Sequence, residues 1–301
     1  MVLKDVTAEQ ERLITLLERG VADDSPEIVD RSLIERLGPA LLENSSVTKP
    51  QLSGEFVRGA FAELIRASYG TNLDGIAVLE HRAKQTIHLD SLGLGGLLIA
   101  LGLAAAGVGR ILTADDTLVG EHDLSPLGYP THQLGDTRIK AVNELFRART
   151  GDTQVLNFDA LTPAKRRHSL RVITAQNAMS PSAYRSLLAD KTPHIAVFFG
   201  TDWVSVSPRI TGRPCLGCLD RHRTETDENW PVLAAQLIGR ADYLEDARSS
   251  LFAASMVVGE ILQAIDTPKE DSEFLGHRLN VASGRVEPWS WQPHESCECA
   301  P

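Results

Sequence analysis

The stretch Gln85–Thr117, QTIHLDSLGLGGLLIALGLAAAGVGRILTADDT, decides the fold of this 301-residue chain. Its pattern predicts a strand at Thr86–Leu89, a glycine-rich turn at Ser91–Gly96, an apolar helix at Leu97–Ala106 and a second strand at Arg110–Ala114. A strand, helix and strand in this order form a crossover unit that builds a parallel sheet. Because strands and helices keep alternating further along the chain, we predict an α/β protein with a doubly wound, Rossmann-like and mostly parallel sheet.

The turn at Ser91–Gly96 opens onto a helix N-terminus, where free N–H groups and the helix dipole favour a phosphate. The nucleotide-binding form of such a turn is Gly-x-Gly-x-x-Gly. With Gly96 as the third glycine, Gly93 is the second and Ser91 stands at the first position, where a Cβ is poorly tolerated. Asp115 follows Gly96 by 19 residues (115 − 96), which suits an acidic residue on a ribose. These residues leave two interpretations open, a nucleotide site and a turn that binds no nucleotide.

The segment Ser91–Gly109 has no charge over 19 residues, the length of a membrane span. Six of the 19 are glycine, a strand-like run precedes the segment and a charged strand end follows it. An uncharged helix between strands is what a doubly wound sheet buries. We therefore expect a core helix and no membrane partner.

The bulk composition argues for a globular protein of the cytoplasm. Hydrophobic residues make up 43% of the chain and charged residues 23%, which is usual for soluble domains. The formal net charge of −10, with no extended basic patch, argues against a nucleic-acid surface. The charged start Met1–Asp5 does not resemble a signal peptide. In the cytoplasm, cysteines serve as thiols or metal ligands more often than as disulfides.

Residues 1–50 are predicted to form a separate N-terminal module with short helices, in the manner of a winged helix. Thr7 is the expected N-cap of the first helix, with Gln10 completing a capping box. Six basic and ten acidic residues give the module a charge of −4 (6 − 10), which argues against DNA as its ligand. A peptide added as a strand is the better functional hypothesis. A helical lid on the main domain, residues 51–301, is the alternative.

The remaining elements are expected from hydrophobic periodicity. A helix and a strand are expected at 55–67 and 75–80, then helices at 135–148, 181–188 and 249–264, and strands at 155–158, 170–174 and 194–199. Alternation at 203–210 indicates an antiparallel extension, and 279–286 predicts two strands around a Ser-Gly turn.

Four cysteines, all that the chain has, lie in two close pairs. They are Cys215 and Cys218, then Cys297 and Cys299 near the C-terminus. Four thiolates suit one tetrahedral zinc ion, which would tie the C-terminal extension to the body across 79 residues (297 − 218). We predict structural zinc, with no open coordination position. A redox pair at Cys215 and Cys218, or a catalytic cysteine with His222 as its base, are the alternatives.

The motif order resembles the ThiF/MoeB and ubiquitin-activating-enzyme superfamily, whose members adenylate a carboxylate with Mg-ATP. Residues 213–223 (RPCLGCLDRHR), Trp230-Pro231 and residues 291–299 (WQPHESCEC) are most similar to actinobacterial ThiF-like proteins. Those proteins are described as cyclodehydratase-associated and as binding the leader of precursors of thiazole/oxazole-modified peptides (TOMMs), a class of ribosomal peptide natural products (RiPPs). The resemblance covers about residues 68–301.

This chain departs from the catalytic pattern that the resemblance implies. Thr117 stands where the superfamily has a second Asp, and Asp123–Leu127 replaces an Asn-Leu-x-Arg-Gln run. Arg138 stands for a phosphate-binding Lys, and Gln176 for the Asp that binds magnesium. Adenylation needs cationic groups and Mg²⁺ on the developing phosphoryl charge, so these losses predict that ATP is not hydrolysed. Ser91, Gly93, Gly96, Asp115 and Arg138 would then form a vestigial nucleotide site.

The resemblance therefore implies a degenerate, non-catalytic protein that binds a precursor leader peptide, supports a YcaO-like cyclodehydratase and forms a homodimer. Two other functions stay open. One is an active adenylyltransferase that uses Asp115 or Asp116 on the ribose and Arg138 on the phosphates. The other is an interaction protein unrelated to peptide modification.

Overall fold

The computed structural model describes residues 6–18, 25–38, 41, 52–71, 74–149, 152–189, 191–240, 242–267 and 275–299. Its helices are α1 (Ala8–Glu18), α2 (Arg31–Leu37), α3 (Gly54–Gly59), α4 (Phe61–Thr71), α5 (Gly75–Ala83), α6 (Leu94–Ala105), α7 (Arg138–Arg149), α8 (Pro181–Ala189), α9 (Leu216–Thr226), α10 (Trp230–Leu237) and α11 (Ala247–Asp266). Its strands are β1 (Thr86–Leu89), β2 (Arg110–Thr113), β3 (Gln154–Asn157), β4 (Leu170–Gln176), β5 (His194–Phe199), β6 (Trp203–Val206), β7 (Gly276–Asn280) and β8 (Val286–Trp289).

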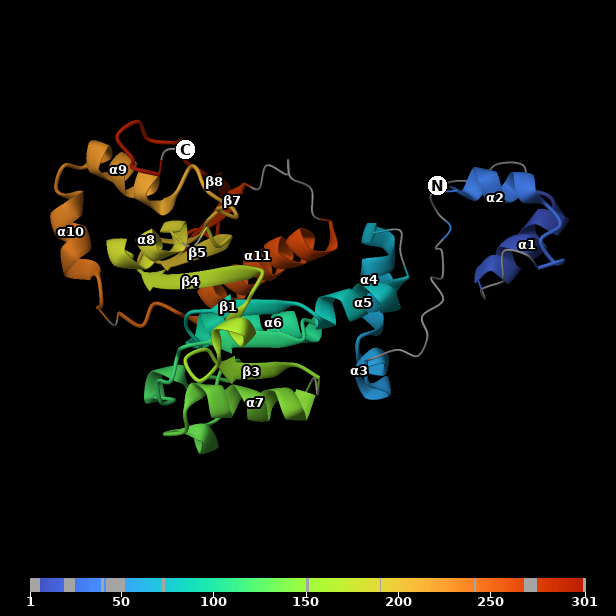
Figure 1. Ribbon diagram of the computed structural model, residues 1–301, viewed down its shortest axis with the longest axis horizontal. Coiled ribbons are helices and arrows are strands. Elements are labelled where there is room, and N and C mark those ends of the chain that lie inside the picture. Colours follow the sequence, from blue (N-terminus) through green and yellow to red (C-terminus); the bar gives the residue numbers. More distant parts are fainter. Residues whose placement is uncertain are drawn as a thin grey trace.

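In the described part of the chain the strands form one eight-stranded sheet, in the order β3-β2-β1-β4-β5-β6-β7-β8. The first five of these are parallel, with Ile87 of β1 paired to Ile111 on one side and Leu170 on the other. β6, β7 and β8 continue the sheet in antiparallel pairing. The predicted doubly wound, mostly parallel sheet and its antiparallel extension are both confirmed (Figure 1).

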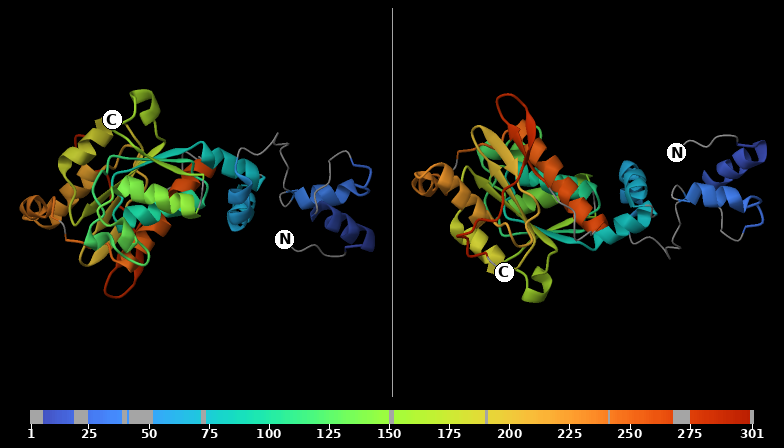
Figure 2. Two further views of the ribbon diagram at one scale, coloured as in Figure 1. Left: turned by 90° about the horizontal axis from the view of Figure 1, so that it is seen from below. Right: turned by 90° about the horizontal axis from the view of Figure 1, so that it is seen from above.

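Helices cover both faces of this sheet, because side chains alternate between faces along each strand. Ile87 and Leu89 face the larger core, where α6 and α11 run together, as Figure 2 shows. Ile173 and Phe198 face the other side, where residues of α8 and α9 cover them. The three-layer arrangement leaves β1 buried at all four positions.

The expected core helix is confirmed as α6, whose apolar residues are buried against the sheet. Among the described residues, one helix, α11, is long and apolar enough to resemble a membrane span, whereas α6 is shorter. One side of α11, including Val257 and Ile261, is fully buried against the same core. That packing is the behaviour of a core helix in an α/β protein.

The N-terminal residues form two helices that pack on each other through Leu13, Leu33 and Leu37. The predicted capping box is present, with Thr7 N–H donating to Gln10 Oε1 at 3.1 Å and Gln10 N–H donating to Thr7 Oγ1 at 3.2 Å. The described residues before β1 contain helices and no strand, so the winged-helix form remains a prediction. So does the boundary at residue 50, which lies with residues 42–51 outside the described part.

The strand expected at residues 75–80 is wrong, because Gly75–Ala83 is helix α5. Asp74 caps it by accepting the Ile76 N–H at 3.0 Å. A Cβ on Gly75 would lie 2.4 Å from the Leu64 carbonyl oxygen, so the glycine lets α5 approach α4 closely. A six-residue apolar run does not separate strand from helix by periodicity. The helix expected at 55–67 is also divided, since α3 ends at Gly59 and α4 begins at Phe61.

Candidate functional site

The site lies where the strand order reverses, at the carboxyl ends of β1 and β4. The Ser91–Gly96 turn follows β1, and β4 ends at Gln176, which Asn177 follows. Open α/β sheets bind ligands at this switch point. The structure therefore brings the predicted turn and the predicted magnesium position to the same edge of the sheet.

The turn is built so that α6 starts close to the strand. A Cβ on Gly96 would lie 1.9 Å from the Ser91 carbonyl oxygen, and one on Gly95 would lie 2.5 Å from the Phe199 ring. Gly93 is the N-cap residue, and its N–H donates to Ser91 Oγ at 3.1 Å. The glycines at 95 and 96 thus serve close packing, while Ser91 closes the turn with its hydroxyl.

Asp115, the predicted ribose ligand, is already fully engaged by the protein. Its Oδ2 accepts the Leu92 N–H at 2.7 Å and an Arg138 N–H at 3.0 Å, and its Oδ1 accepts the Thr117 N–H at 3.1 Å. Burial opposes ionisation, but the bonds to Leu92 and Thr117 and the charge of Arg138 outweigh it and lower the pKa of Asp115. Its carboxylate is therefore a buried, charged junction between the turn and α7.

Arg138, the predicted phosphate ligand, is held between two carboxylates. Besides its bond to Asp115, Arg138 donates two hydrogen bonds to Asp123, from Nη2 to Oδ1 at 2.7 Å and from Nε to Oδ2 at 3.2 Å. Burial opposes its charge, yet Asp115 and Asp123 outweigh burial and raise the pKa of Arg138. The cation that the active-enzyme alternative needs is thus already neutralised by the protein.

Glu245 binds the N-terminus of α6, the end of a helix that attracts anions such as phosphate. Its Oε2 accepts the Gly95 N–H at 2.7 Å, in the first turn of α6. A Cβ on Gly93 would come within 2.9 Å of the same oxygen, so the carboxylate lies directly against the turn. Burial raises the pKa of Glu245, although the Gly95 N–H and Arg138 act in the opposite direction. Sequence reasoning missed Glu245 entirely.

The segment at 242–246 carries this carboxylate across the edge of the sheet. Asp242 N–H donates to Gln176 Oε1 at 2.8 Å, and Asn177 Nδ2 donates to Asp242 Oδ2 at 2.8 Å. The Tyr243 ring packs on His122 with centroids 4.4 Å apart. Gln176, at the predicted magnesium position, therefore uses its amide to hold a protein segment over the site.

The four cysteines form a second centre between α9 and the C-terminal residues. The Sγ atoms of Cys215 and Cys218 are 4.0 Å apart, those of Cys215 and Cys297 3.6 Å, and those of Cys218 and Cys299 3.4 Å. Tetrahedral zinc with Zn–S bonds of about 2.3 Å places sulfurs about 3.8 Å apart. The donor set fits the ion, so the four cysteines could hold one structural metal.

The surroundings of the cysteines also suit a structural metal. Trp291 Nε1 donates to the Cys215 carbonyl oxygen at 2.8 Å, and a Cβ on Gly217 would lie 3.3 Å from Cys215 Sγ. Burial raises the pKa of the Cys215 thiol, so an adjacent cation is what would keep it ionised. Together the four sulfurs and this tryptophan join residues 291–299, called the tail below, to the start of α9.

His222, considered above as a catalytic base, has Nε2 paired with a backbone carbonyl oxygen and Nδ1 turned towards a carboxylate. Its Nε2 meets the Gln292 carbonyl oxygen at 2.9 Å and its Nδ1 faces Glu225 at 3.4 Å. Arg223, one residue further along α9, is only partly exposed. Its guanidinium lies 5.0 Å from the Phe198 ring centroid and 4.7 Å from that of Trp230.

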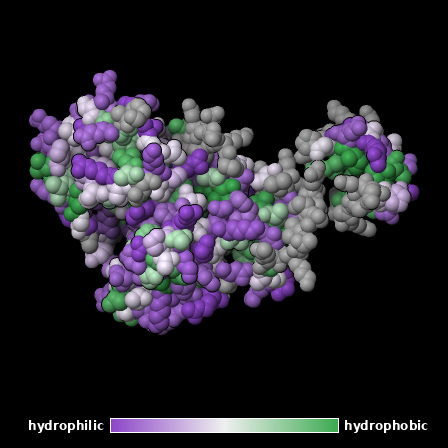
Figure 3. Space-filling view, in the orientation of Figure 1, coloured by the Kyte–Doolittle hydropathy of each residue, from purple (hydrophilic) through white to green (hydrophobic). Residues whose placement is uncertain are grey.

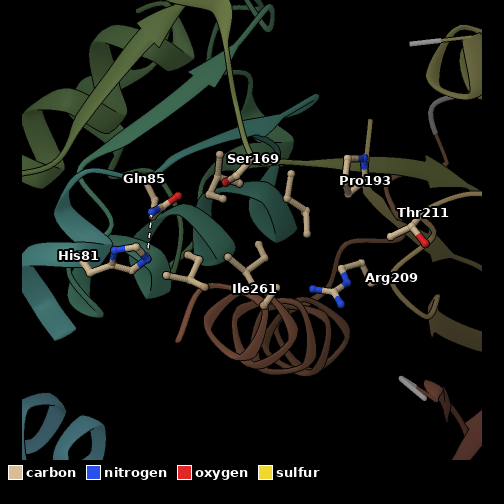
Figure 4. Close-up of a pocket in the computed structure, with 11 residues that line it drawn as sticks. His81, Gln85, Ser169, Pro193, Arg209, Thr211 and Ile261 are labelled. Atoms are coloured by element: carbon tan, nitrogen blue, oxygen red, sulfur yellow. Dashed lines mark hydrogen bonds between the residues drawn. The ribbon is translucent and has the colours of Figure 1, made fainter. Parts of the chain in front are cut away.

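Two cavities lined by described residues lie at the opposite, amino edge of the parallel strands. One, of about 330 Å³, is shown in Figure 4. Its walls are mostly apolar, with Ile87, Leu170 and Ile261, and polar side chains such as His81 and Arg209 stand around it. The other, of about 600 Å³, includes Phe56 and Arg110. Neither is lined by the Ser91–Gly96 turn.

Comparison with known proteins gives a clear result at the level of structure. No family model and no curated protein matches the sequence. Among solved structures, E. coli MccB with ATP superposes with a TM-score of 0.65 at 12% identity, over 98% of this chain and 86% of that chain. PaaA superposes with a TM-score of 0.66 at 16% identity, over 96% of this chain and 92% of that one.

A further MccB structure, of the "Microcin C7 biosynthetic enzyme MccB in complex with N-formylated MccA", has a TM-score of 0.63 at 14% identity, over 83% of this chain and 77% of that chain. The likenesses confirm the ThiF-like fold expected from the motifs. Identity this low carries the fold alone, so the TOMM leader-binding subgroup remains a proposal.

Proposed function

We propose that this chain is a non-catalytic ThiF-like protein that binds the leader of a ribosomal precursor peptide and supports a partner cyclodehydratase. The observation that carries the proposal is that the protein's own side chains occupy the nucleotide cradle, a name we give to the Ser91–Gly96 turn together with Asp115 and Arg138. Glu245 holds the Gly95 N–H at the start of α6, and Arg138 is shared by Asp115 and Asp123. The groups that would grip a triphosphate are therefore bound to the protein's own carboxylates.

The energetic cost of admitting ATP supports this proposal. A triphosphate at the turn would have to displace Glu245 and draw Arg138 away from two carboxylates that are 7% and 2% exposed. Breaking a buried ion pair costs about 3 kcal/mol. At 1.4 kcal/mol for each tenfold change, that cost alone lowers affinity about 100-fold. Gln176 adds no anionic ligand for Mg²⁺.

The N-terminal unit is the part that we propose to bind the peptide. Figure 3 shows apolar residues on the visible face of the α1/α2 unit. Val29, two residues before α2, is 62% exposed. Exposed apolar surface beside polar residues is typical of interaction sites. MccB, which shares the fold, has been solved with MccA bound, which makes a bound partner of that kind a reasonable model. Residues 1–50 are then the recognition module and 51–301 the scaffold.

Three further elements complete the proposal. The cysteine cluster holds structural zinc and fixes the tail. The scaffold forms a homodimer, and the protein acts in the cytoplasm beside a YcaO-like cyclodehydratase. The zinc follows from the four clustered cysteines, the cytoplasmic location from the composition, and the homodimer and the cyclodehydratase from the motif resemblance of residues 213–223 and 291–299.

The test is calorimetry of the full chain with MgATP and with the precursor peptide encoded beside its gene. We expect micromolar binding of the complete precursor, no binding of a precursor that lacks its leader, and no heat with MgATP. Val29→Asp should weaken peptide binding, while Glu121→Gln, an exposed carboxylate near the cradle, should not. Micromolar MgATP affinity together with peptide-dependent ATP–pyrophosphate exchange would instead establish the second candidate, an adenylyltransferase, which the MccB complex with ATP favours.

A further inference from the structure

A cluster of two histidines and a glutamate lies beside the cysteine centre, outside the sites described above. His222 and Glu225 stand one turn apart on α9, and His294 comes from the C-terminal residues that run along this helix. Glu225 Oε1 is 2.9 Å from His294 Nε2, and Glu225 Oε2 is 3.4 Å from His222 Nδ1. One ligand atom from each of the three residues lies within 4.8 Å of the other two.

The hydrogen bonds around His222 aim one nitrogen into the cluster. Its Nε2 is 2.9 Å from the Gln292 carbonyl oxygen, which can only accept, so Nε2 carries the proton. The lone pair of Nδ1 is left pointing at Glu225. Fixing the tautomer through a bond to the outer nitrogen is how proteins orient a histidine that ligates a metal.

We propose that His222 Nδ1, His294 Nε2 and a Glu225 oxygen form a second metal site, distinct from the cysteine centre, for a divalent transition-metal ion such as zinc. Bonds of about 2.1 Å at tetrahedral angles separate ligand atoms by about 3.4 Å. The carboxylate of Glu225 already lies close to both imidazoles, with Oε1 2.9 Å from His294 Nε2 and Oε2 3.4 Å from His222 Nδ1. Two neutral imidazoles and one carboxylate are a donor set that suits zinc.

One proton must move for His294 to ligate. Its Nδ1 now accepts the Ser296 N–H at 3.1 Å, and its Nε2 faces Glu225. When the metal binds Nε2, the proton leaves that nitrogen and Nδ1 takes one up, so the imidazole stays neutral. Ser296, which is exposed, exchanges its bond to His294 for one to water. The rearrangement thus breaks two hydrogen bonds, the one from Ser296 to His294 Nδ1 and the one between His294 Nε2 and Glu225, and the bonds to the metal replace the second.

The proposed site differs from the cysteine centre in being open. Three protein ligands leave at least one position for water or for a ligand from another molecule. Glu225 has a side chain that is 64% exposed, so the ion would be reached from solvent. The metal would fasten the tail to α9 at His294, three residues before Cys297 (297 − 294), giving a second attachment point beyond the cysteines.

The experiment is a zinc titration of the full chain whose cysteine centre already holds one zinc. We expect a second equivalent to bind in the wild type, and the affinity of that equivalent to fall at least tenfold in His294→Gln and Glu225→Gln. The affinity of His222→Gln for this equivalent should fall as far, because glutamine can still donate to the Gln292 carbonyl oxygen but lacks the ligand nitrogen Nδ1. Glu295→Gln and His132→Gln, which alter exposed residues of the same types, are the matched controls and should bind as the wild type does.

Cobalt separates the two sites by spectroscopy. Cobalt in the cysteine centre gives sulfur-to-metal charge-transfer absorption, whereas cobalt added after the first zinc should give only weak bands without sulfur character. Retention of the first zinc in each variant shows that the fold around α9 is intact. The proposal is overturned if the wild type takes up a single zinc, or if the second equivalent binds the ligand variants and the controls equally well.

Discussion

The carboxylate of Glu245 accepts a hydrogen bond of 2.7 Å from the N–H of Gly95, although 150 residues separate the two. Helix N-termini with free N–H groups attract anions, and glycine-rich turns expose those groups to phosphate. Here the anion is supplied by the protein, at the end of the segment that Gln176 and Asn177 hold across the sheet edge. This contact makes the cradle a structural joint and gives the first prediction.

Replacing Glu245 with alanine should open the cradle to a simple anion. The Gly95 N–H and the first turn of α6 then face water or added phosphate. We expect inorganic phosphate to raise the thermal unfolding midpoint of Glu245→Ala and to leave that of the wild type unchanged. A ligand at ten times its Kd stabilises by about 1.4 kcal/mol, which a thermal scan resolves. Equal stabilisation of the wild type, or of the control Glu121→Ala, would show that phosphate binds elsewhere.

Arg138 should be more important for stability than for ligand binding. Arg138→Met leaves Asp115 and Asp123 buried without a counter-charge, and we expect a loss of about 3 kcal/mol in the free energy of unfolding. Urea denaturation measures it. Lys140→Met, on the same helix, breaks a surface ion pair with Asp136 and should leave the urea midpoint of unfolding unchanged. If the two variants behave alike, Arg138 is not the junction described here.

The cysteine centre should retain zinc through purification, and Cys218→Ser or Cys299→Ser should lose it. Trp291 reports on the loss, because its Nε1 donates to the Cys215 carbonyl oxygen. We expect the zinc content to fall by one equivalent per chain in these variants, and the tryptophan emission to shift to longer wavelength as the tail detaches. Ser296→Ala, in the same segment, is the control that keeps both signals. A folded wild type without zinc would contradict the assignment.

Features encoded within a short window were predictable from the sequence. The strand, turn and helix around Ser91–Gly96 follow from one apolar run broken by glycines, and the Thr7 capping box from a spacing of three residues. The cysteine pairs were predictable although distant, because cysteine is rare in this chain and thiolates have few structural uses. In each case a local or chemically distinctive signal was present.

The state of the cradle was not predictable, because it depends on distant residues of common types. Glu245 is one of many acidic residues, and nothing near it in sequence marks it as the group that meets Gly95. Asp123 was recognised from the sequence only as part of a run that departs from Asn-Leu-x-Arg-Gln, and the structure shows that it binds Arg138. A sequence shows which charges exist, but the fold decides which of them are already paired.

The last prediction concerns acid and His88, in the middle of the sheet. His88 is 2% exposed, stacks on Phe158 at 4.5 Å and has no hydrogen-bond partner for either ring nitrogen among the described residues. Burial, then the charges of Arg171 and His168, lower its pKa from 6.5 to about 3. Between those two values the unfolded imidazole binds a proton and the folded one does not, so stability falls as the pH falls from 6.5 towards 3.

His88→Phe should remove this acid sensitivity while keeping the stacking on Phe158. At pH 5.0, which is 1.5 units below the ordinary pKa of 6.5, we expect the free energy of unfolding of the wild type to be about 2 kcal/mol lower than at pH 7.5. The variant should not show this loss. Urea unfolding of both proteins at pH 7.5 and 5.0 measures the difference, in which other titrating groups such as Asp90 and His194 largely cancel. His132→Gln, an exposed histidine, should track the wild type at both values. If His88→Phe also loses stability in parallel with the wild type, then His88 is protonated in the folded protein and Asp90, 3.8 Å from its Nε2, is the group that accommodates the charge.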